Sequence, residues 1–118
     1  MPDLSKFDRL YRQKLFSSGD SAATVTVKTL PTDPKTVRVL THVTVENQTN
    51  AYTKLRIGIE NTGEKYYLNE LDTPAADELA VNPYDIVLGE ADRFFAELTG
   101  TTDGDIVLVT LVGWEVYK

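Results

Sequence analysis

Side chains able to do acid–base or nucleophilic chemistry are few in this sequence. It contains one histidine, His42, and no cysteine among its 118 residues. A zinc site takes several His, Cys or carboxylate ligands, and a catalytic triad needs a histidine beside an activated serine. The serines all lie in the first fifth of the chain, and none has the sequence context of a nucleophile elbow. We therefore predict no catalytic residue, no bound metal and no cofactor.

Carboxylates are plentiful and leave an alternative open. A glycoside hydrolase needs two of them flanking a cleft, and nothing in the sequence singles out such a pair. The acidic turns Asp103-Gly104-Asp105 and Glu90-Ala91-Asp92 could offer oxygen ligands to Ca²⁺. The first of these turns is too short for an EF-hand loop, and a reverse turn explains it completely. A Ca²⁺-dependent ligand-binding module remains an alternative interpretation.

Aromatic side chains permit another kind of binding. Tyr66 and Tyr67 are neighbours in a strand-like segment, so they point to opposite faces and one of them is expected to be exposed. Sugar-binding modules use exposed tyrosine and tryptophan rings as platforms for stacking on sugars. The single tryptophan, Trp114, also lies in a strand-like segment and fits a core position better. A small carbohydrate-binding β-sandwich is therefore part of the same alternative.

The charge of the chain is unevenly distributed. The net charge is −6, and residues 70–118 hold two basic and eleven acidic side chains. Such a surface repels phosphate, so nucleic-acid binding is not expected. No apolar run approaches the roughly 18 residues of a membrane span, and the start lacks the pattern of a signal peptide. We therefore expect neither nucleic acid nor membrane among the partners.

The first twenty residues differ in pattern from the rest. Their apolar side chains recur at the spacing of one helix face, and Ser17-Ser18-Gly19-Asp20 would end such a helix. We predict an amphipathic helix over residues 3–18, either packed on the domain or reaching a neighbouring subunit as an arm. The expected division is an N-terminal helix or arm at residues 1–20 and a β-sandwich domain at residues 21–118. The apolar positions are Leu4, Phe7, Leu10, Tyr11, Leu15 and Phe16.

From residue 22 onward the apolar period changes to two, which is typical of strands with one buried face. Within residues 36–46, the alternation places Val37, Val39, Thr41, Val43 and Val45 on one face. No helix pattern separates the strands, which excludes a parallel sheet built from βαβ units. The prediction is an all-β, jelly-roll-like sandwich of about seven or eight antiparallel strands. Strands are expected over residues 24–30, 36–46, 54–60, 65–69 and 84–88, with a long connection over 70–83 and two more strands in the last third.

The last third of the chain organises the predicted fold. Residues 88–99 and 106–117 read as a hairpin around Thr102-Asp103-Gly104-Asp105, because glycine accepts a positive φ at such a turn. Both faces of residues 106–117 are apolar, whereas a sandwich strand buries only one face. Something must therefore cover the other face, either the N-terminal helix, a loop or another subunit, and exposed apolar area of this kind marks an interface. The predicted interface residues are Leu4, Phe7, Leu10, Tyr11, Val107, Val109, Leu111 and Tyr117.

The segment from Leu88 to Asp105 also carries a resemblance. Its pattern G-x-x-D-x-(apolar)-x-A-x-x-x-G-x-x-x-G-D, followed by an apolar strand with Gly113-Trp114, resembles the closing hairpin of small jelly-roll structural proteins of tailed bacteriophages. The resemblance implies a non-enzymatic component of the virion, either a head decoration or cement protein or a neck or tail accessory protein. It further implies a homo-oligomer, with a trimer among the options, whose partners are other structural subunits of the virion.

Overall fold

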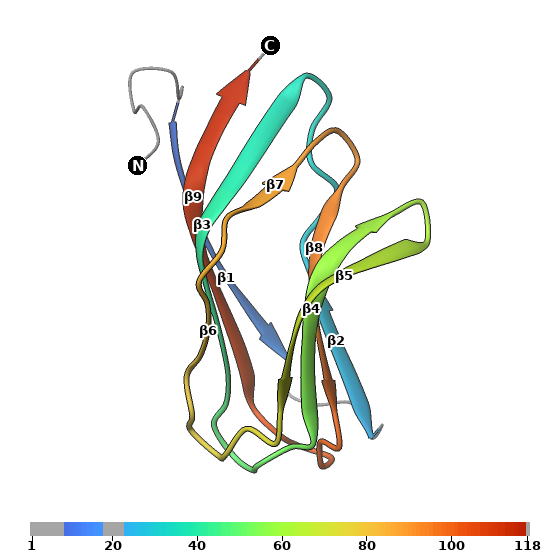
Figure 1. Ribbon diagram of the computed structural model, residues 1–118, viewed down its shortest axis with the longest axis vertical. Helices are drawn as coiled ribbons and strands as arrows, with labels where there is room; N and C mark the ends of the chain where they lie inside the picture. The colour runs from blue at the N-terminus through green and yellow to red at the C-terminus, as the bar shows by residue number, and fades with distance from the viewer. Residues whose placement is uncertain (1–8, 18–22, 118) are drawn as a thin grey trace.

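The computed structural model describes residues 9–17 and 23–117, which form nine strands in two antiparallel sheets (Figure 1). The predicted all-β sandwich is confirmed. The strands are β1 Arg9–Ser17, β2 Thr24–Lys28, β3 Thr36–Asn47, β4 Lys54–Asn61, β5 Glu64–Asp72, β6 Ala80–Asn82, β7 Ile86–Leu88, β8 Arg93–Thr99 and β9 Val107–Tyr117.

The order of the strands identifies the type of sandwich. Sheet A has the order β1-β9-β3, with β6 and β7 both paired to the far side of β3, and sheet B has the order β2-β8-β4-β5. Pro83 lies between β6 and β7 and has no N–H to donate, so the two short strands fill one strand position that proline interrupts. Each strand otherwise crosses to the other sheet from the one before it, except in the β4–β5 hairpin. The fold is a jelly roll.

The core lies between the two sheets, where alternate residues of each inner face interdigitate. Sheet B contributes Phe94, Ala96 and Leu98 from β8, none of which is exposed to solvent. Sheet A contributes Val107, Val109 and Leu111 from β9, which are equally inaccessible. The remaining buried hydrophobic residues of the core cluster are Val25, Val27, Leu40, Val43, Val45, Tyr52, Leu55, Ile57, Ala80, Ile86 and Leu88.

Residues 9–17 form a strand and not the predicted helix. β1 pairs with β9 over its whole length, from Arg9 opposite Glu115 to Ser17 opposite Val107. Its side chains alternate between exposed and half-buried, with Tyr11 and Leu15 packed against the core. Pairing along an entire neighbouring strand outweighs the weak intrinsic helix preference of the segment. The predicted division at residue 20 therefore leaves β1 on the side of the arm although it is part of sheet A, and residues 1–8 lie outside the described residues.

The turn at residues 102–105 is present, but β8 and β9 do not form the predicted hairpin. Asp105 donates its backbone N–H to the carbonyl of Thr102 at 3.1 Å, and Gly104 has a φ of +87°. However, β8 pairs with β2 and β4 in sheet B, whereas β9 pairs with β1 and β3 in sheet A. A local turn signal specifies a reversal of the chain and not the sheet that the next strand joins.

A β-bulge changes the faces of β3. The pairing of β3 with β9 shifts between Leu40 and His42, which leaves Thr41 as the extra residue. Before the bulge Leu40 points inward, and after it Val43 and Val45 point inward. The predicted single face from Val37 to Val45 is therefore wrong, because Val37 and Val39 lie on the outer face of sheet A.

Candidate interaction surface

The outer face of sheet A carries a row of apolar side chains across four strands. Leu10 on β1 lies opposite Trp114 on β9, Trp114 lies opposite Val39 on β3, and Val39 lies opposite Val87 on β7. Directly opposed residues in a sheet point to the same face, so the four side chains form a continuous band. Leu10 is 42% exposed and Val87 is 56% exposed at the two ends of this band.

Three valines widen this band along the strands. Val37 and Val116 are paired one step beyond Trp114, and Val112 lies one step before it. These valines, like Val39 and Trp114, are half-buried, because neighbouring side chains on the same sheet cover their flanks. We call the set Leu10, Val37, Val39, Val87, Val112, Trp114 and Val116 the outer apolar face.

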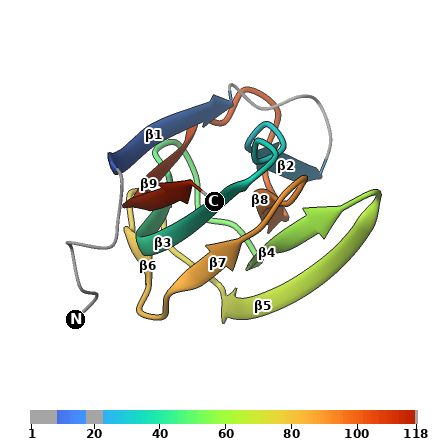
Figure 2. The same cartoon turned by 90° about the horizontal axis from the view of Figure 1, so that it is seen from above.

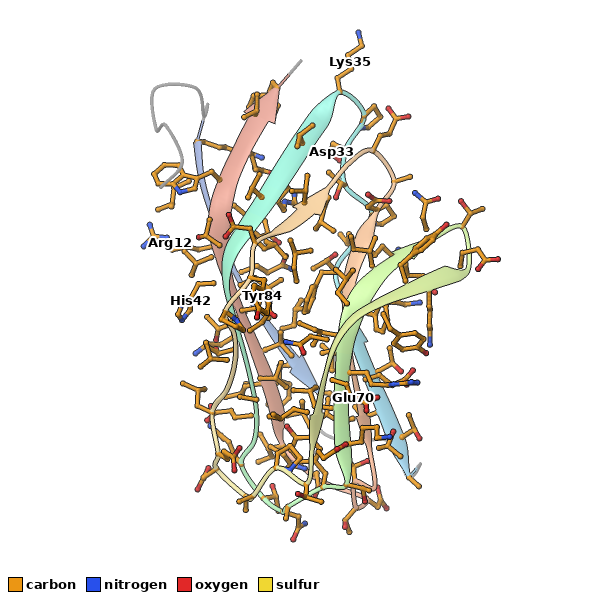
Figure 3. All side chains as sticks on the ribbon, in the orientation of Figure 1. Arg12, Asp33, Lys35, His42, Glu70 and Tyr84 are labelled. Atoms are coloured by element: carbon orange, nitrogen blue, oxygen red, sulfur yellow. The ribbon has the colours of Figure 1, made fainter. Side chains whose placement is uncertain are left out.

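Sheet B packs on the inner side of sheet A, and no strand among residues 9–17 and 23–117 packs on the outer side (Figure 2). Arg12 and His42, which are paired with Val112, project from this outer side next to the band (Figure 3). His42 is exposed. The single histidine therefore borders the outer apolar face.

The structure places the predicted interface residues in several different environments. Leu10 lies on the outer apolar face, and Tyr117 is 45% exposed at the end of β9. Val107, Val109 and Leu111 lie in the core, so their side chains are not available to a partner. Leu4 and Phe7 lie outside the described residues, and Tyr11 points inward beneath a charged cluster.

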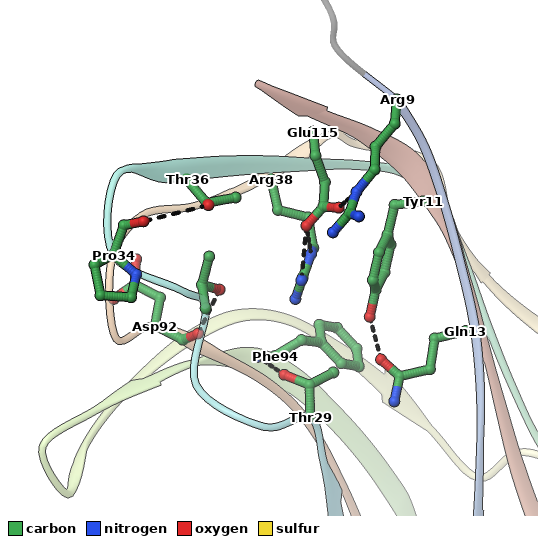
Figure 4. Close-up of polar contacts among 11 residues, drawn as sticks. Arg9, Tyr11, Gln13, Thr29, Pro34, Thr36, Arg38, Asp92, Phe94 and Glu115 are labelled. Atoms are coloured by element: carbon green, nitrogen blue, oxygen red, sulfur yellow. Dashed lines mark hydrogen bonds and ion pairs between the residues drawn. The ribbon is translucent and has the colours of Figure 1, made fainter. Parts of the chain in front are cut away.

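The charged cluster occupies one end of the sandwich interior (Figure 4). The Glu115 carboxylate, 1% exposed, accepts hydrogen bonds from Arg9 and from Arg38. The Arg38 guanidinium lies over the Tyr11 ring at 4.0 Å from the ring centre. Burial acts to raise the pKa of Glu115, but hydrogen bonds from Arg9 and Arg38 outweigh it and bring this pKa below its usual value. Because its charge is paired, Glu115 can be buried near the end of β9, at one end of the sandwich interior.

The outer face of sheet B is built in the opposite manner from that of sheet A. Ion pairs cross it between Lys28 and Glu60, between Arg56 and Glu70, and between Lys65 and Glu97. Its one large apolar ring, Phe95, has no exposed area, because the ring packs on the gap left by Gly58 and Tyr67 meets it edge to face at 5.4 Å. Charged and hydrogen-bonded side chains therefore satisfy this face within the chain.

The aromatic side chains expected to be exposed take different positions. Tyr67 lies on the outer face of sheet B, between Phe95 and the Arg56 guanidinium, which is 4.4 Å from the ring centre. Tyr66 is 56% exposed, and Tyr84, between β6 and β7, is 70% exposed. Tyr66 and Tyr84 are therefore more open than Tyr67, whose ring is engaged by its neighbours.

The two acidic turns use their carboxylates to hold the chain together. Asp105 is fully buried and accepts hydrogen bonds from the side chains of Asn47 and Asn50 and from the backbone of Thr102. Asp92 accepts one from Asn61 and one from the backbone N–H of Gly89. Within the described part of the chain, no three His, Cys, Asp or Glu side chains are grouped as a metal site would require.

A groove opens between β5 and β6, at the side where the two sheets part. Its floor is apolar, with Val43 and Ile57 among the residues that line it. Asn69 on β5 donates a hydrogen bond to Asn82 on β6 at 3.0 Å, which ties the two sheets together across the opening. The room inside is about 50 Å³, well below the ~300 Å³ of an ordinary small-molecule pocket.

No known protein-family model and no curated protein sequence matches the chain. Solved structures are similar to it in fold. A protein assigned as an alpha-L-fucosidase from Bacteroides thetaiotaomicron matches with a TM-score of 0.50 and 7% identity, over 85% of this chain and 21% of that one. This chain therefore corresponds to only about a fifth of that protein.

Two viral structures are also similar. The virus-like particle protein of the extra small virus of the prawn Macrobrachium rosenbergii matches with a TM-score of 0.49 and 13% identity, over 93% of this chain and 80% of that one. A protein of the infectious bursal disease virus Gt strain matches with a TM-score of 0.43 and 10% identity, over 94% of this chain and 34% of that one.

Among the described residues, no helix is long and apolar enough to cross a membrane.

Proposed function

We propose that this protein is a non-enzymatic structural protein that binds another protein through the outer apolar face of sheet A. We further propose that it works in the virion of a tailed phage, as a head decoration or cement protein or as a neck or tail accessory protein. Its partners are then other structural subunits of the same virion.

The outer apolar face is the observation that carries this proposal. A two-layer sandwich needs apolar side chains only on its inner faces, so polar side chains would serve equally well on the outside. Burying one valine or leucine side chain contributes about 1.5–3 kcal/mol. The band from Leu10 to Val87 leaves part of that free energy unused in the isolated domain, and a partner that covers the band would gain it.

The contrast between the two outer faces supports the same proposal. Sheet B covers its one large outer ring, Phe95, and pairs its charges across the strands. The ion pairs among the described residues include none that crosses the outer face of sheet A. Apolar cores with polar rims are characteristic of protein interfaces, and Arg12 and His42 supply polar groups at the rim.

The proposed place in a phage virion rests on the resemblance of residues 88–114 to small jelly-roll proteins of tailed phages. The structure gives this segment a role consistent with that reading, because β9 supplies Trp114 to the middle of the outer apolar face. The acidic second half of the chain also favours protein partners over nucleic acid.

The experiment is to look for the protein in purified particles of the phage that encodes it. Quantitative mass spectrometry of density-purified virions should find the chain in a fixed ratio to the major capsid or tail protein. A phage carrying Val39→Lys together with Val87→Lys should yield particles that have lost most of the chain, because two charges would be buried at the contact.

The matched control is Leu30→Lys, which changes an exposed apolar side chain in the connection between β2 and β3. This variant should be retained in particles as the natural chain is. Absence of the natural chain from purified virions would refute the virion assignment. Full retention of the Val39→Lys, Val87→Lys variant would refute docking through the outer apolar face.

A second candidate function, glycan binding, is favoured by the exposure of Tyr66 and Tyr84 on the side of the sandwich where β5 and β6–β7 lie. Exposed tyrosine rings can stack on sugars. Calorimetry against a panel of soluble oligosaccharides tests it: binding that is lost in both Tyr66→Ala and Tyr84→Ala, without a change in melting temperature, would establish this function. If calorimetry detects no binding heat with any oligosaccharide of the panel, the result counts against glycan binding.

A further inference from the structure

Two long strands, each the last strand of its sheet among the described residues, lie at opposite corners of the sandwich. β1 is the last strand of sheet A and β5 is the last strand of sheet B, and each has nine residues. Seen from above, they occupy diagonally opposite positions (Figure 2). Within the described part of the chain, β1 pairs only with β9, and β5 pairs only with β4. A free edge exposes backbone N–H and C=O groups that another strand can pair with.

The other two edges of the sandwich are poorly suited to such pairing. β2 has only five residues. The edge made by β6 and β7 consists of two three-residue strands separated by Pro83, which cannot donate a backbone hydrogen bond. The edges of β1 and β5 are therefore the ones long enough for a stable intermolecular contact.

Charge distinguishes these two edges. β1 carries three basic side chains, of which Arg9 is paired with Glu115, and no acidic one. Arg12 and Lys14 are exposed and enter none of the ion pairs among the described residues. Two copies of β1 placed edge to edge would bring these cations together, so β1 disfavours pairing with itself.

β5 carries the complementary charge. Glu64, Glu70 and Asp72 are exposed, and its one cation, Lys65, is already paired with Glu97. Asp72 enters none of the ion pairs among the described residues, and Glu70 contacts Arg56 and Lys54. With three carboxylates and one cation, β5 therefore carries a net negative charge, opposite to that of β1, and Asp72 is the carboxylate at this end of the strand that lies outside the ion pairs.

The spacing of the charges matches between the two edges. Arg12 and Lys14 lie two residues apart on the outer face of sheet A, opposite Val112 and Thr110. Glu70 and Asp72 also lie two residues apart, on the outer face of sheet B with Arg56 and Lys54. An antiparallel pairing that sets Arg12 opposite Asp72 also sets Lys14 opposite Glu70.

We propose that β1 of one copy of this chain pairs with β5 of the next copy, so that sheet A of one molecule continues into sheet B of its neighbour. Backbone hydrogen bonds supply the contact, and the match between cations on β1 and carboxylates on β5 sets its polarity. Opposite charges at facing positions stabilise a strand pair, and like charges destabilise it.

This contact is head to tail, because it joins two different surfaces of the same molecule. Contacts of this kind close into a ring or continue as a fibre. β1 and β5 lie at opposite corners, so one copy can hold a neighbour on each side. The contact also leaves the outer apolar face of sheet A open to a different protein.

Sedimentation of the purified 118-residue chain at low salt, with two charge-reversed variants, tests the proposal. The natural chain should form assemblies of about three or more copies that dissociate as salt is added, since salt screens charge pairs at the surface. Arg12→Glu with Lys14→Glu, and separately Glu70→Lys with Asp72→Lys, should each be monomeric. An equimolar mixture of the two variants should assemble again, because each junction in the mixture then joins opposite charges.

Recovery in the mixture is the decisive result, because a variant that had failed to fold could not rescue its partner. Asp72→Lys alone is the milder second variant, since Asp72 enters no ion pair among the described residues. It should raise the concentration needed for assembly about tenfold while the chain still folds cooperatively, with a slightly lower melting temperature because the new lysine would face Lys54 on β4. Lys35→Glu, which lies in the exposed turn before β3, is the control and should assemble as the natural chain does.

A natural chain that stays monomeric at low salt, a discrete dimer, or a mixture that does not reassemble would each overturn the proposal. These outcomes are separate from the virion proposal. A chain could be incorporated into virions through the outer apolar face without pairing β1 to β5. The variant Glu70→Lys with Asp72→Lys lies on sheet B and leaves the outer apolar face unchanged.

Discussion

Glu115 on β9 accepts two hydrogen bonds from Arg38 on the neighbouring strand β3, at 2.9 Å from Nε and 2.8 Å from Nη2, both at the same carboxylate oxygen. The carboxylate is 1% exposed and the Arg38 side chain 12% exposed. The pair lies on the inner face of sheet A, which also carries the core residues Val107, Val109 and Leu111.

Removing one partner of this pair should strongly destabilise the fold. Glu115→Ala leaves the Arg38 guanidinium largely buried without a counter-charge, at an expected cost of about 3 kcal/mol in the free energy of unfolding. Arg38→Met combined with Glu115→Leu removes both charges and should cost less than the single change. Urea denaturation followed by circular dichroism measures both, and equal losses for the single and the double variant would contradict the explanation.

Acid should unfold the protein partly through Glu115. Burial opposes ionisation, but hydrogen bonds from Arg9 and Arg38 hold the pKa of Glu115 below its usual value. The stability from this depressed pKa is fully present above the unfolded-state pKa of about 4.3 and is lost as pH falls through the lower folded-state pKa. Melting temperature measured from pH 6 down to about pH 3 should therefore fall steeply below about pH 4.

The control for this pH dependence is Glu115→Gln, which cannot titrate. Its melting temperature should be lower at pH 6, and the difference from the natural chain should shrink as the pH falls. Asp105, whose pKa is also lowered, remains in this variant, so some acid sensitivity should persist. A constant difference at every pH would show that Glu115 does not contribute through its charge.

Asp105 should be the residue of the 102–105 turn that matters most for stability. Its carboxylate is buried and holds Asn47 at 2.8 Å and Asn50 at 2.6 Å, which joins the end of β3 to the loop before β9. Asp105→Ala leaves the buried Asn47 amide without its acceptor, at an expected cost of about 2–3 kcal/mol. Asp103→Ala, an exposed change in the same turn, should cost less than about 0.5 kcal/mol. Urea titrations of the two variants make the comparison, and similar midpoints would contradict it.

Gly113 should tolerate no side chain. A Cβ atom there would lie 1.8 Å from the carbonyl oxygen of Val39, which is backbone and cannot turn away. Gly113→Ala should therefore cost about 3 kcal/mol or prevent folding, as severe overpacking does. Gly63, in the β4–β5 turn with a φ of +84° and no neighbour within 4 Å, is the matched control.

Gly63→Ala should cost only about 1 kcal/mol, from the strain of a positive φ. Soluble expression and thermal melting of the two variants distinguish the effects. The explanation fails if both alanine variants melt at the same temperature.

Local patterns in the sequence were sufficient for much of the fold. The alternation of residues 54–60 predicts that Leu55, Ile57 and Ile59 point inward, and the structure packs all three in or against the core. The turn at Thr62-Gly63 does connect a true hairpin, because Asn61 is paired with Glu64 on either side of it. Both signals depend on residues within a few positions of one another, which a single sequence displays directly.

Long-range pairing could not be predicted in the same way. The turn at 102–105 looks the same whether the next strand pairs with β8 or crosses to sheet A. Because of the bulge at Thr41, the alternation of inward and outward side chains along β3 changes register at this residue. Gly113, which lies opposite Leu40, is 72 positions further along the sequence. β1 likewise becomes a strand because β9 is beside it.

The interface itself stays a prediction, but three of the residues predicted for it, Val107, Val109 and Leu111, lie in the core. Both faces of residues 106–117 are apolar, so the sequence indicated that the opposite sheet would leave one face unburied. It did not indicate which of the two faces that would be. Val107, Val109 and Leu111 lie in the core, whereas Val112, Trp114 and Val116 lie on the outer face of sheet A. Val39 and Val87 join that face only through the register of β3 with its neighbours.

The position of β9 governs when the domain can assemble on the ribosome. β9 is the last of the nine described strands in sequence, yet it lies in the interior of sheet A between β1 and β3. β1 must therefore remain without its partner until residues 107–117 have left the exit tunnel. Strand pairs this distant in sequence form slowly, and unpaired edges are prone to aggregate while they wait. The cations Arg12 and Lys14 on β1 would repel the same strand of neighbouring nascent chains on a polysome during that interval.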